Sequence, residues 1–308
     1  MIFIEIAFLK NVMKASAPGK VILFGEHAVV YGRHAVASAI GLRCYVEARK
    51  SNDIKIISPL GVTGLNFNVH PYVSYAIKRF CEVIPIKGVE IRIKSDIPIA
   101  SGLGSSSAVT VAVLKALDGE FEAGLSDEDI YEIARKVEID VQGIGSGTDP
   151  FVCTFGKTWL IPERKLIRLK NKMKILIVNT NESSITAEMV RKVAKLREKY
   201  KEIVDRIFDT IDSITLKAID ALEKSDLATL SDLVFLNQCM LKAIGVSSKR
   251  IDELVEKLYD LKISAKITGA GGGGCVIGIG MVDALEKCVR EIGGILIDLD
   301  EEGVRFER

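Results

Sequence analysis

Apolar and polar positions in the first half of the chain predict strands that precede helices. Small apolar residues without helix breakers predict a buried helix over residues 106–118, and residues 70–83 also show a helical pattern. Ser126, with an acidic residue three positions later, predicts the capped start of a helix that continues to about Asp140. Clusters of β-branched and apolar residues between Gly and Pro are typical of strands, and they fall at residues 21–24, 28–30, 44–48, 54–57 and 89–93.

The second half is predicted to open with a strand over residues 172–179 and to continue with long charged helices. The change of pattern near residues 162–172 predicts two domains, over residues 1–165 and 166–308. Apolar spacings of three and four predict a helix face that packs against the core, formed by Val190, Val193, Leu196, Tyr200 and Ile203. The remaining predicted elements are helices over 227–243, 247–261 and 282–292 and strands over 264–268, 276–279 and 294–299.

The first nine residues are apolar, but Glu5 interrupts them and they are too short to span a bilayer. They also lack the basic region and the cleavage site of a signal peptide. Because residues 13–20 would themselves make a natural start to the first strand, residues 1–12 are either an upstream start or an extra edge strand. No other segment approaches the length of a membrane span, so we expect a soluble chain with no membrane partner.

Composition excludes several classes of protein. With 42 Lys and Arg against 41 Asp and Glu, the 308-residue chain has a net charge of +1, whereas a dedicated nucleic-acid binder shows a clear basic excess. The six cysteines form no C-x-x-C pair, and the three histidines form no zinc-binding motif. We therefore expect reduced thiols in a cytoplasmic protein that binds no nucleic acid.

Residues 98–108, Pro-Ile-Ala-Ser-Gly-Leu-Gly-Ser-Ser-Ser-Ala, lie between a predicted strand and a predicted helix. Gly102 and Gly104 allow backbone amides to approach an anion closely, and the helix N-terminus and the serine hydroxyls add further donors. The segment matches neither the Walker motif nor the dinucleotide-binding fingerprint. We interpret it as a phosphate-binding loop, and the alternative is a simple turn that caps a helix.

A second glycine segment covers residues 266–275, Lys-Ile-Thr-Gly-Ala-Gly-Gly-Gly-Gly-Cys. Five glycines in six positions between two predicted strands cost more backbone entropy than a simple hairpin needs. Close approach of this backbone to a ligand or to the first glycine loop explains the glycines better than a surface turn does. We expect the two loops to meet around one triphosphate.

Lys20 stands alone in an otherwise apolar strand that breaks into Gly-Glu-His at residues 25–27. A lone strand lysine is usually a solvated edge residue. Glu138 and Asp149 change this interpretation, because a glycine-rich return of only ten residues separates the two carboxylates. Paired carboxylates, a phosphate-binding loop and a lysine are the groups that metal-assisted phosphoryl transfer requires.

Together, these three segments resemble the GHMP kinases, a superfamily of small-molecule kinases, and their order extends over nearly the whole chain. Residues 20–32 (Lys-Val-Ile-Leu-Phe-Gly-Glu-His-Ala-Val-Val-Tyr-Gly) and 266–275 resemble most the branch that phosphorylates mevalonate. Galactokinases carry Gly-Glu-His-Thr-Asp after the first strand, phosphomevalonate kinases usually carry Gly-Glu-Tyr, and homoserine kinases lack counterparts of Lys20 and Asp149.

The resemblance implies ATP-dependent phosphorylation of the mevalonate 5-hydroxyl in isoprenoid biosynthesis. The alternative within the superfamily is a kinase that acts on phosphomevalonate or another small alcohol. An alternative from a different class is a catalytically silent sensor that binds nucleotide. A silent member would normally have lost one of Lys20, Glu138 and Asp149, and all three are present.

The resemblance also implies roles for individual residues. Asp149 would lie beside the substrate hydroxyl, as general base or as an orienting group, and Lys20 would lie beside Asp149 and the γ-phosphate. Mg²⁺ would be bound by Glu138 and Ser106, with Ser105 as the alternative ligand. Residues implied to line the mevalonate site are Glu26, His27, Ser184 and Thr186. Residues implied to bind the ATP phosphates are Pro98, Ala100, Ser101, Gly102, Leu103, Gly104, Ser105, Ser106, Ser107, Gly271 and Gly272.

The fold implied by the family is α+β with two domains. The N-terminal domain would resemble domain 2 of ribosomal protein S5, and the C-terminal domain would be ferredoxin-like with added helices. The active site would lie in the cleft between them. The family also suggests a homodimer. Residues 60–68 are either an adenine-binding loop or a surface turn.

Overall fold

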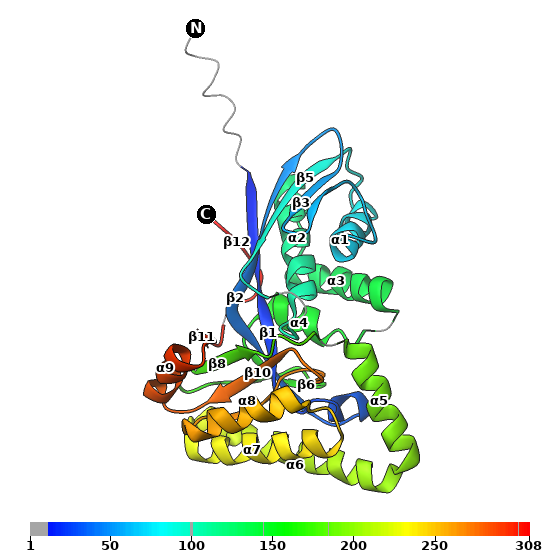
Figure 1. The fold of residues 1–308 in the computed structure, drawn as a ribbon. Coiled ribbons are helices and arrows are strands. Elements are labelled where there is room, and N and C mark those ends of the chain that lie inside the picture. The colour runs from blue at the N-terminus through cyan, green and yellow to red at the C-terminus, as the bar shows by residue number, and fades with distance from the viewer. Residues whose placement is uncertain (1–11, 99–100, 144, 184, 301) are drawn as a thin grey trace.

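The computed structural model describes residues 12–98, 101–143, 145–183, 185–300 and 302–308. Figure 1 shows two bodies, each built on a β-sheet, that share one long hairpin. The hairpin consists of β1 (Met13–Phe24) and β2 (Ala35–Lys50), which are antiparallel and paired along most of their length. Because β1 begins in the upper body of Figure 1 and ends in the lower one, its residues connect the two.

The first sheet surrounds this hairpin. Its other strands are β3 (Lys55–Ser58), β4 (Gly61–Thr63), β5 (Val89–Ser95), β6 (Thr158–Ile161), β7 (Lys165–Ile167) and β12 (Arg305–Phe306). The strand order is β12–β1–β2–β5–β3–β4, and β6 joins β2 to β7. Neighbouring strands are antiparallel apart from β3 and β5, which are parallel. The strands predicted over residues 44–48, 54–57 and 89–93 are confirmed.

Helices cover one face of the first sheet, and they are α1 (Pro71–Cys81), α2 (Ser105–Phe121), α3 (Asp127–Gln142) and α4 (Thr148–Phe155). The small apolar residues of α2 are buried because this helix packs against both β1 and β2. Ser126 caps α3: its hydroxyl accepts a hydrogen bond from the amide of Asp129, whose carboxylate accepts one from the amide of Ser126. The predicted helices of this half, including the capped one, are confirmed.

The tip of the hairpin corrects one prediction. Residues 28–30 are not a strand but belong to η2 (Ala28–Tyr31), a 3-10 helix. The backbone has positive φ angles of 94° at Gly25 and 60° at His27, which turn the chain out of the extended direction just before η2. Val30 is 57% exposed, so this side chain, although β-branched and typical of strands, points into solvent.

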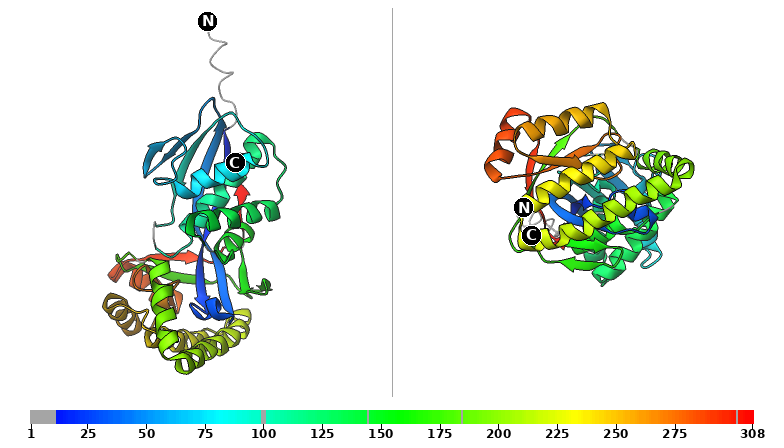
Figure 2. Two further views of the ribbon diagram at one scale, coloured as in Figure 1. Left: turned by 90° about the vertical axis from the view of Figure 1, so that its right-hand side faces the viewer. Right: turned by 90° about the horizontal axis from the view of Figure 1, so that it is seen from below.

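The second body contains another antiparallel sheet, with the strand order β11–β8–β10–β9. Figure 2 shows from below that α6 and α7 run side by side beneath it. Each element predicted for this half is present, and α7 spans the predicted residues. The strands are β8 (Lys174–Asn179), β9 (Ser264–Ile267), β10 (Cys275–Ile279) and β11 (Ile295–Asp298), and the helices are α5 (Thr186–Lys199), α6 (Lys201–Lys224), α7 (Leu227–Ala243), α8 (Lys249–Asp260) and α9 (Val282–Glu291).

The predicted apolar face over residues 190–203 is only partly correct. Val193 is buried in α5, but the helix ends at Lys199 and a new one begins at Lys201. The backbone of Tyr200, with φ of −133° and ψ of 52°, is not helical, so the face does not continue in register across it. Tyr200 and Ile203 are 45% and 61% exposed, and they therefore lie outside the core.

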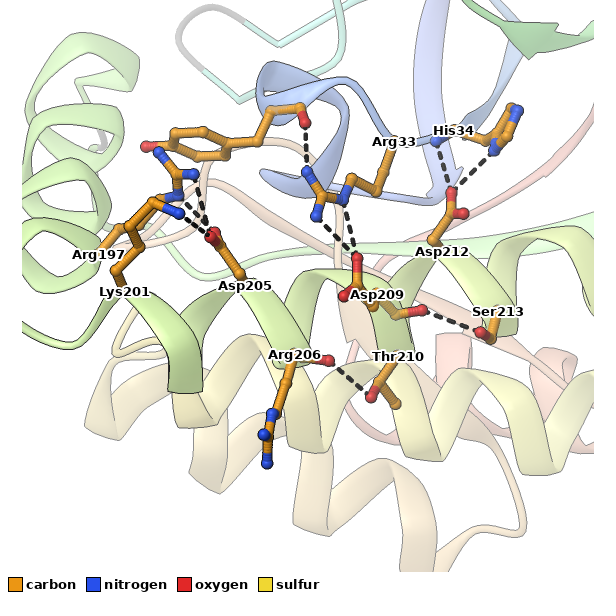
Figure 3. A network of polar contacts seen from close by, with 11 residues as sticks. Arg33, His34, Arg197, Lys201, Asp205, Arg206, Asp209, Thr210, Asp212 and Ser213 are labelled. Atoms are coloured by element: carbon orange, nitrogen blue, oxygen red, sulfur yellow. Dashed lines mark hydrogen bonds and ion pairs between the residues drawn. The ribbon is translucent and has the colours of Figure 1, made fainter.

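Polar contacts attach the hairpin tip to α6, as Figure 3 shows. The guanidinium of Arg33 donates to the carboxylate of Asp209 at 2.7 Å. The carboxylate of Asp212 accepts from both the amide and the Nδ1 nitrogen of His34, at 2.7 and 2.8 Å. The Nε2 nitrogen of His34 lies 2.9 Å from the carboxylate of Glu163. Arg33 and His34, which follow η2 and Gly32, are thus held against α6 of the second body.

The two-domain α+β organisation is confirmed, whereas the domain limits at residues 165 and 166 stay a prediction. The last strand, β12, returns to the first sheet and pairs with β1. Residues 1–11 lie outside the described residues, so the prediction that residues 1–12 are an upstream start or an edge strand falls almost wholly outside them. No helix in the described part of the chain is both long and apolar enough to cross a membrane.

Candidate active site

Lys20 and Asp149 form an ion pair where the two bodies meet. Lys20 lies in β1 and is only 5% exposed, and its ammonium nitrogen is 3.1 Å from Oδ2 of Asp149. The same ammonium donates to the carbonyl oxygen of Gly102, also at 3.1 Å. Asp149 is the second residue of α4, and 32% of its side chain is exposed. The lysine is therefore not a solvated edge residue, and its partner carboxylate is accessible from outside.

Glu138, in the last turns of α3, is the second carboxylate of the site. Burial raises the pKa of Glu138 to about 7, and the charge of Asp149 acts in the same direction. Its Oε2 accepts a hydrogen bond from the amide of Gly147 at 3.0 Å. Gly145 allows the loop to fold back this closely, because a Cβ there would lie 2.4 Å from Oε2 of Glu138. The loop between α3 and α4 thus holds both carboxylates in one region.

The first glycine loop leads into the N-terminus of α2. Gly104 precedes the helix with φ of 75°, and a Cβ there would lie 2.7 Å from Cγ of Lys20. Only glycine permits both the backbone angle and this close approach. Because Gly104 has no side chain to cap the helix, the first amides of α2 and the positive end of its dipole are left for an anion. Ser105 and Ser106, the first residues of α2, are half-buried.

The two glycine loops meet, as we expected. A Cβ on Gly269 would lie 3.7 Å from the carbonyl oxygen of Gly102, and one on Gly274 would lie 3.2 Å from that of Ser101. A hydrogen bond of 2.8 Å from the amide of Gly274 to the carbonyl oxygen of Glu182 holds the second loop on its other side. The backbones of both loops therefore border one region next to Lys20.

The Gly-Glu-His turn lies against the second loop. The Nε2 nitrogen of His27 is 2.9 Å from the carbonyl oxygen of Ala270, and burial lowers the pKa of His27 although this hydrogen bond opposes the effect. The carboxylate of Glu26 is ion-paired with Lys266 and accepts a hydrogen bond of 3.1 Å from Asn237. At 2% exposure, Glu26 lies behind the site, and a substrate that contacted its carboxylate would have to displace these partners.

Several residues implied to bind phosphate offer only their backbone. The hydroxyl of Ser101 donates to the carbonyl oxygen of Pro98 at 2.7 Å, and the side chain of Leu103 is fully buried in the core. Ser107 is also buried, within α2. Ala100 lies outside the described residues. Of the serines at the start of α2, Ser105 and Ser106 are therefore the more accessible to a ligand.

The remaining implied residues lie at the edge of the second body. Thr186 is the exposed first residue of α5, and Ser184 lies outside the described residues. Gly271 and Gly272 both have φ of 73°, which places the middle of the second loop in a left-handed conformation. Thr186 follows the β8–α5 connection, and Gly271 and Gly272 lie in the β9–β10 connection.

The sequence reasoning missed Lys266 and Asn237 as contributors to the site. Lys266 is fully buried, and burial lowers its pKa while its ion pair with Glu26 opposes this. Asn237 is fully buried in α7. One signal was available for the lysine, since it stands in a short apolar strand directly before the glycine run. Asn237 has no such signal, because one amide among the apolar residues of a helix does not indicate its partner.

The arrangement suits the transfer of a phosphoryl group. Two glycine loops and an uncapped helix end present donors for phosphate oxygens, and the Lys20 ammonium supplies positive charge beside the accessible Asp149. Burial raises the pKa of Glu138 most, and repulsion by the charge of Asp149 adds to this effect. A hard divalent cation with oxygen ligands would relieve this repulsion, so the carboxylates fit Mg²⁺.

Comparison with known proteins identifies the class. The model of the GHMP kinases N terminal domain matches residues 71–157, and that of the GHMP kinases C terminal domain matches residues 218–293, together more than half of the chain. The chain belongs to the GHMP kinase family. It is therefore an ATP-dependent small-molecule kinase, and its two bodies form the fold of that family.

Individual relatives narrow the class further. The mevalonate kinase of Archaeoglobus fulgidus is 52% identical over 295 residues, which cover 96% of this chain and all of the relative. The mevalonate kinase of Pyrococcus horikoshii is 37% identical and covers 95% of this chain and 97% of its own. The crystal structure of the Methanococcus jannaschii mevalonate kinase matches with a TM-score of 0.81 and 31% identity, over 97% of this chain and 98% of that one.

Proposed function

We propose that this kinase phosphorylates mevalonate on its 5-hydroxyl, with ATP as the donor. The observation that carries the proposal is the Lys20–Asp149 pair, in which Lys20 also binds the first glycine loop at Gly102 and Asp149 is partly exposed. Similarity over nearly the full length to proteins named mevalonate kinase supports the choice of substrate. The His27 side chain beside the second loop is consistent with the same branch of the family.

In the proposed reaction, Asp149 accepts the hydrogen bond of the substrate hydroxyl and takes its proton as the new bond forms. The hydroxyl oxygen bonds to the γ-phosphorus, the bond from that phosphorus to the β–γ bridging oxygen breaks, and ADP leaves. The Lys20 ammonium balances charge on the transferring group. The difference in exposure supports these separate roles of Asp149 and Lys20, because the side chain of Lys20 is 7% exposed and that of Asp149 is 32% exposed.

We further propose that Glu138 and the hydroxyl of Ser106 hold Mg²⁺ on the ATP phosphates. When bound, the ion would neutralise phosphate charge and orient the γ-phosphate. The raised pKa of Glu138 supports this assignment, because a carboxylate that is buried beside another carboxylate gains from a nearby cation. Ser105 is the alternative hydroxyl ligand at the same helix end.

We also propose that the protein is cytoplasmic and that it forms a homodimer. All six cysteines are free thiols, which is usual for proteins of a reducing compartment. Exposed apolar side chains at Leu60, Val62, Leu65 and Phe67 give the first body a surface that a second copy could cover. Sedimentation of the purified protein tests the dimer, and a single monomeric species at micromolar concentration would contradict it.

The substrate assignment is tested by a panel of alcohols. Purified protein with ATP and Mg²⁺ is given mevalonate, phosphomevalonate, homoserine or galactose, and ADP release is followed in a coupled assay. We expect the highest kcat/KM with mevalonate. Turnover of another alcohol without turnover of mevalonate would overturn the assignment, and nucleotide binding without ADP release on any alcohol would indicate a silent sensor.

A further inference from the structure

The Gly-Glu-His turn has an unusual backbone. His27 has φ of 60° and ψ of −44°, and the amide of Ala28 donates to the carbonyl oxygen of Glu26 at 2.7 Å. A hydrogen bond between residues two apart around such angles defines the rare form of the γ-turn, which is strained for any residue other than glycine. Strain of this kind persists only where neighbouring contacts hold it in place.

The contacts that hold this turn are buried and charged. The carboxylate of Glu26 pairs with the ammonium of Lys266, and its other oxygen accepts from the amide of Asn237. The ammonium of Lys266 also donates to the carbonyl oxygen of Ile267 at 2.6 Å. The side chains of Glu26 and Lys266 are 1% and 0% exposed, so water does not weaken their attraction as it would at the surface.

One short segment supplies three successive attachments to the first strand and the turn. Residues 266–270 run from β9 into the second glycine loop. Lys266 binds Glu26, the hydroxyl of Thr268 bonds to both the amide and the carbonyl oxygen of Ile22, and the carbonyl oxygen of Ala270 binds His27. The strand that carries Lys20 is therefore fixed in register against the segment that opens the second loop.

We propose that Lys266 and Asn237 are positioning residues for phosphoryl transfer, because they hold Glu26 and the strained His27 turn and thereby set Lys20 against the two glycine loops. Neither side chain is exposed to a ligand, and both act through Glu26. The kinetic test of this inference rests on the proposed function. The structural test, by hydrogen exchange, rests on the geometry alone.

The test separates positioning from stability by comparing two variants. Lys266→Met leaves the Glu26 carboxylate buried without its cation, so we expect a lower Tm. In the double variant Lys266→Met with Glu26→Gln, no charge is orphaned. The new amide can donate to Oδ1 of Asn237, a buried atom without a hydrogen-bond partner among the described residues. We expect the double variant to regain most of the lost Tm.

Activity should not return with stability. We expect both variants to show a kcat lower by about 100-fold, the effect of a displacement of about 1 Å at a reacting centre, with a smaller change in the KM for ATP. Arg43→Met is the matched control, because Arg43 forms another buried ion pair, 2.6 Å from Asp300. Its other hydrogen bonds go to Ser16, Glu302 and Gly303, and not to the Gly-Glu-His turn or to residues 266–270. This control should lose Tm and keep kcat.

Two results would overturn the inference. One is a double variant that regains both Tm and kcat, and the other is an Arg43→Met variant that loses kcat as strongly as the double variant. If the wild type does not turn over mevalonate, the proposed function fails, and hydrogen exchange then decides the inference. Faster exchange of the amides at 20–29 and 267–274 in the double variant, absent from Arg43→Met, supports it; unchanged exchange contradicts it.

Discussion

Gly104 brings the first glycine loop against the aliphatic side chain of Lys20, and its replacement by alanine perturbs that contact directly. The backbone φ of 75° costs an L-residue about 1–2 kcal/mol. The added Cβ would lie 2.7 Å from Cγ and 3.3 Å from Cε of Lys20, so the lysine side chain must move. Because a displacement of about 1 Å at a reacting centre costs about 100-fold in rate, we expect kcat to fall by that factor in a folded protein.

Gly124→Ala is the matched control for this variant. Gly124 has φ of 71°, and a Cβ there would have no heavy atom within 4 Å. The two variants therefore carry the same backbone cost and differ in the contact with Lys20. Thermal unfolding and coupled ADP release should show similar losses of Tm and a loss of kcat in Gly104→Ala alone. Wild-type kcat in Gly104→Ala, or an equal loss in both variants, would refute the reasoning.

Three further predictions concern charge. Lys20→Met and Asp149→Asn should each lower kcat by about 10²–10⁴-fold with less effect on the KM for ATP, and near-normal kcat in both would contradict their roles. Since the pKa of Glu138 is raised to about 7, the apparent Mg²⁺ affinity should fall as pH drops below that value, as calorimetry with bound nucleotide would show. A Mg²⁺ affinity that does not change with pH, or one that changes equally in Glu138→Gln, would argue against Glu138 as a ligand. Burial lowers the pKa of His34, but its two carboxylate partners outweigh this and raise it above 6.5, so its stabilisation is full below pH 6.5 and is lost as pH rises through the folded pKa. His34→Asn should remove that pH dependence from the unfolding temperature, and an unchanged dependence would contradict the assignment.

Much of the fold was predictable because long elements carry their own signals. The capping box of α3, the continuous small apolar face of α2 and the alternation in β5 are local properties that tertiary packing did not override. Short elements lack such signals. The strand β12 (Arg305–Phe306) exists only because it pairs with β1, and η2 follows from a strained turn that buried partners stabilise.

The sequence predicts which segments form the site, but not which buried side chains pair with one another. The glycine loops predict a close approach of backbones, because glycine costs conformational entropy where no such approach requires it. Lys20 and Asp149 form the ion pair that the site needs. The family resemblance implies that Glu26 lines the substrate site, and this stays a prediction; the sequence does not indicate that Lys266 and Asn237 bind its carboxylate. Such pairs join the turn after β1 to residues more than 200 positions away, and no local pattern encodes which buried polar groups will meet.

The central claim is that this chain transfers the γ-phosphate of ATP to the 5-hydroxyl of mevalonate. Phosphorus NMR of a reaction with equal amounts of ATP and mevalonate tests it most directly, because the product itself is observed. The account predicts that ADP and a phosphate ester at the 5-position form in equal amounts, and that Asp149→Asn slows both equally. ATP that stays intact, or ADP formed with inorganic phosphate and no ester, would contradict it.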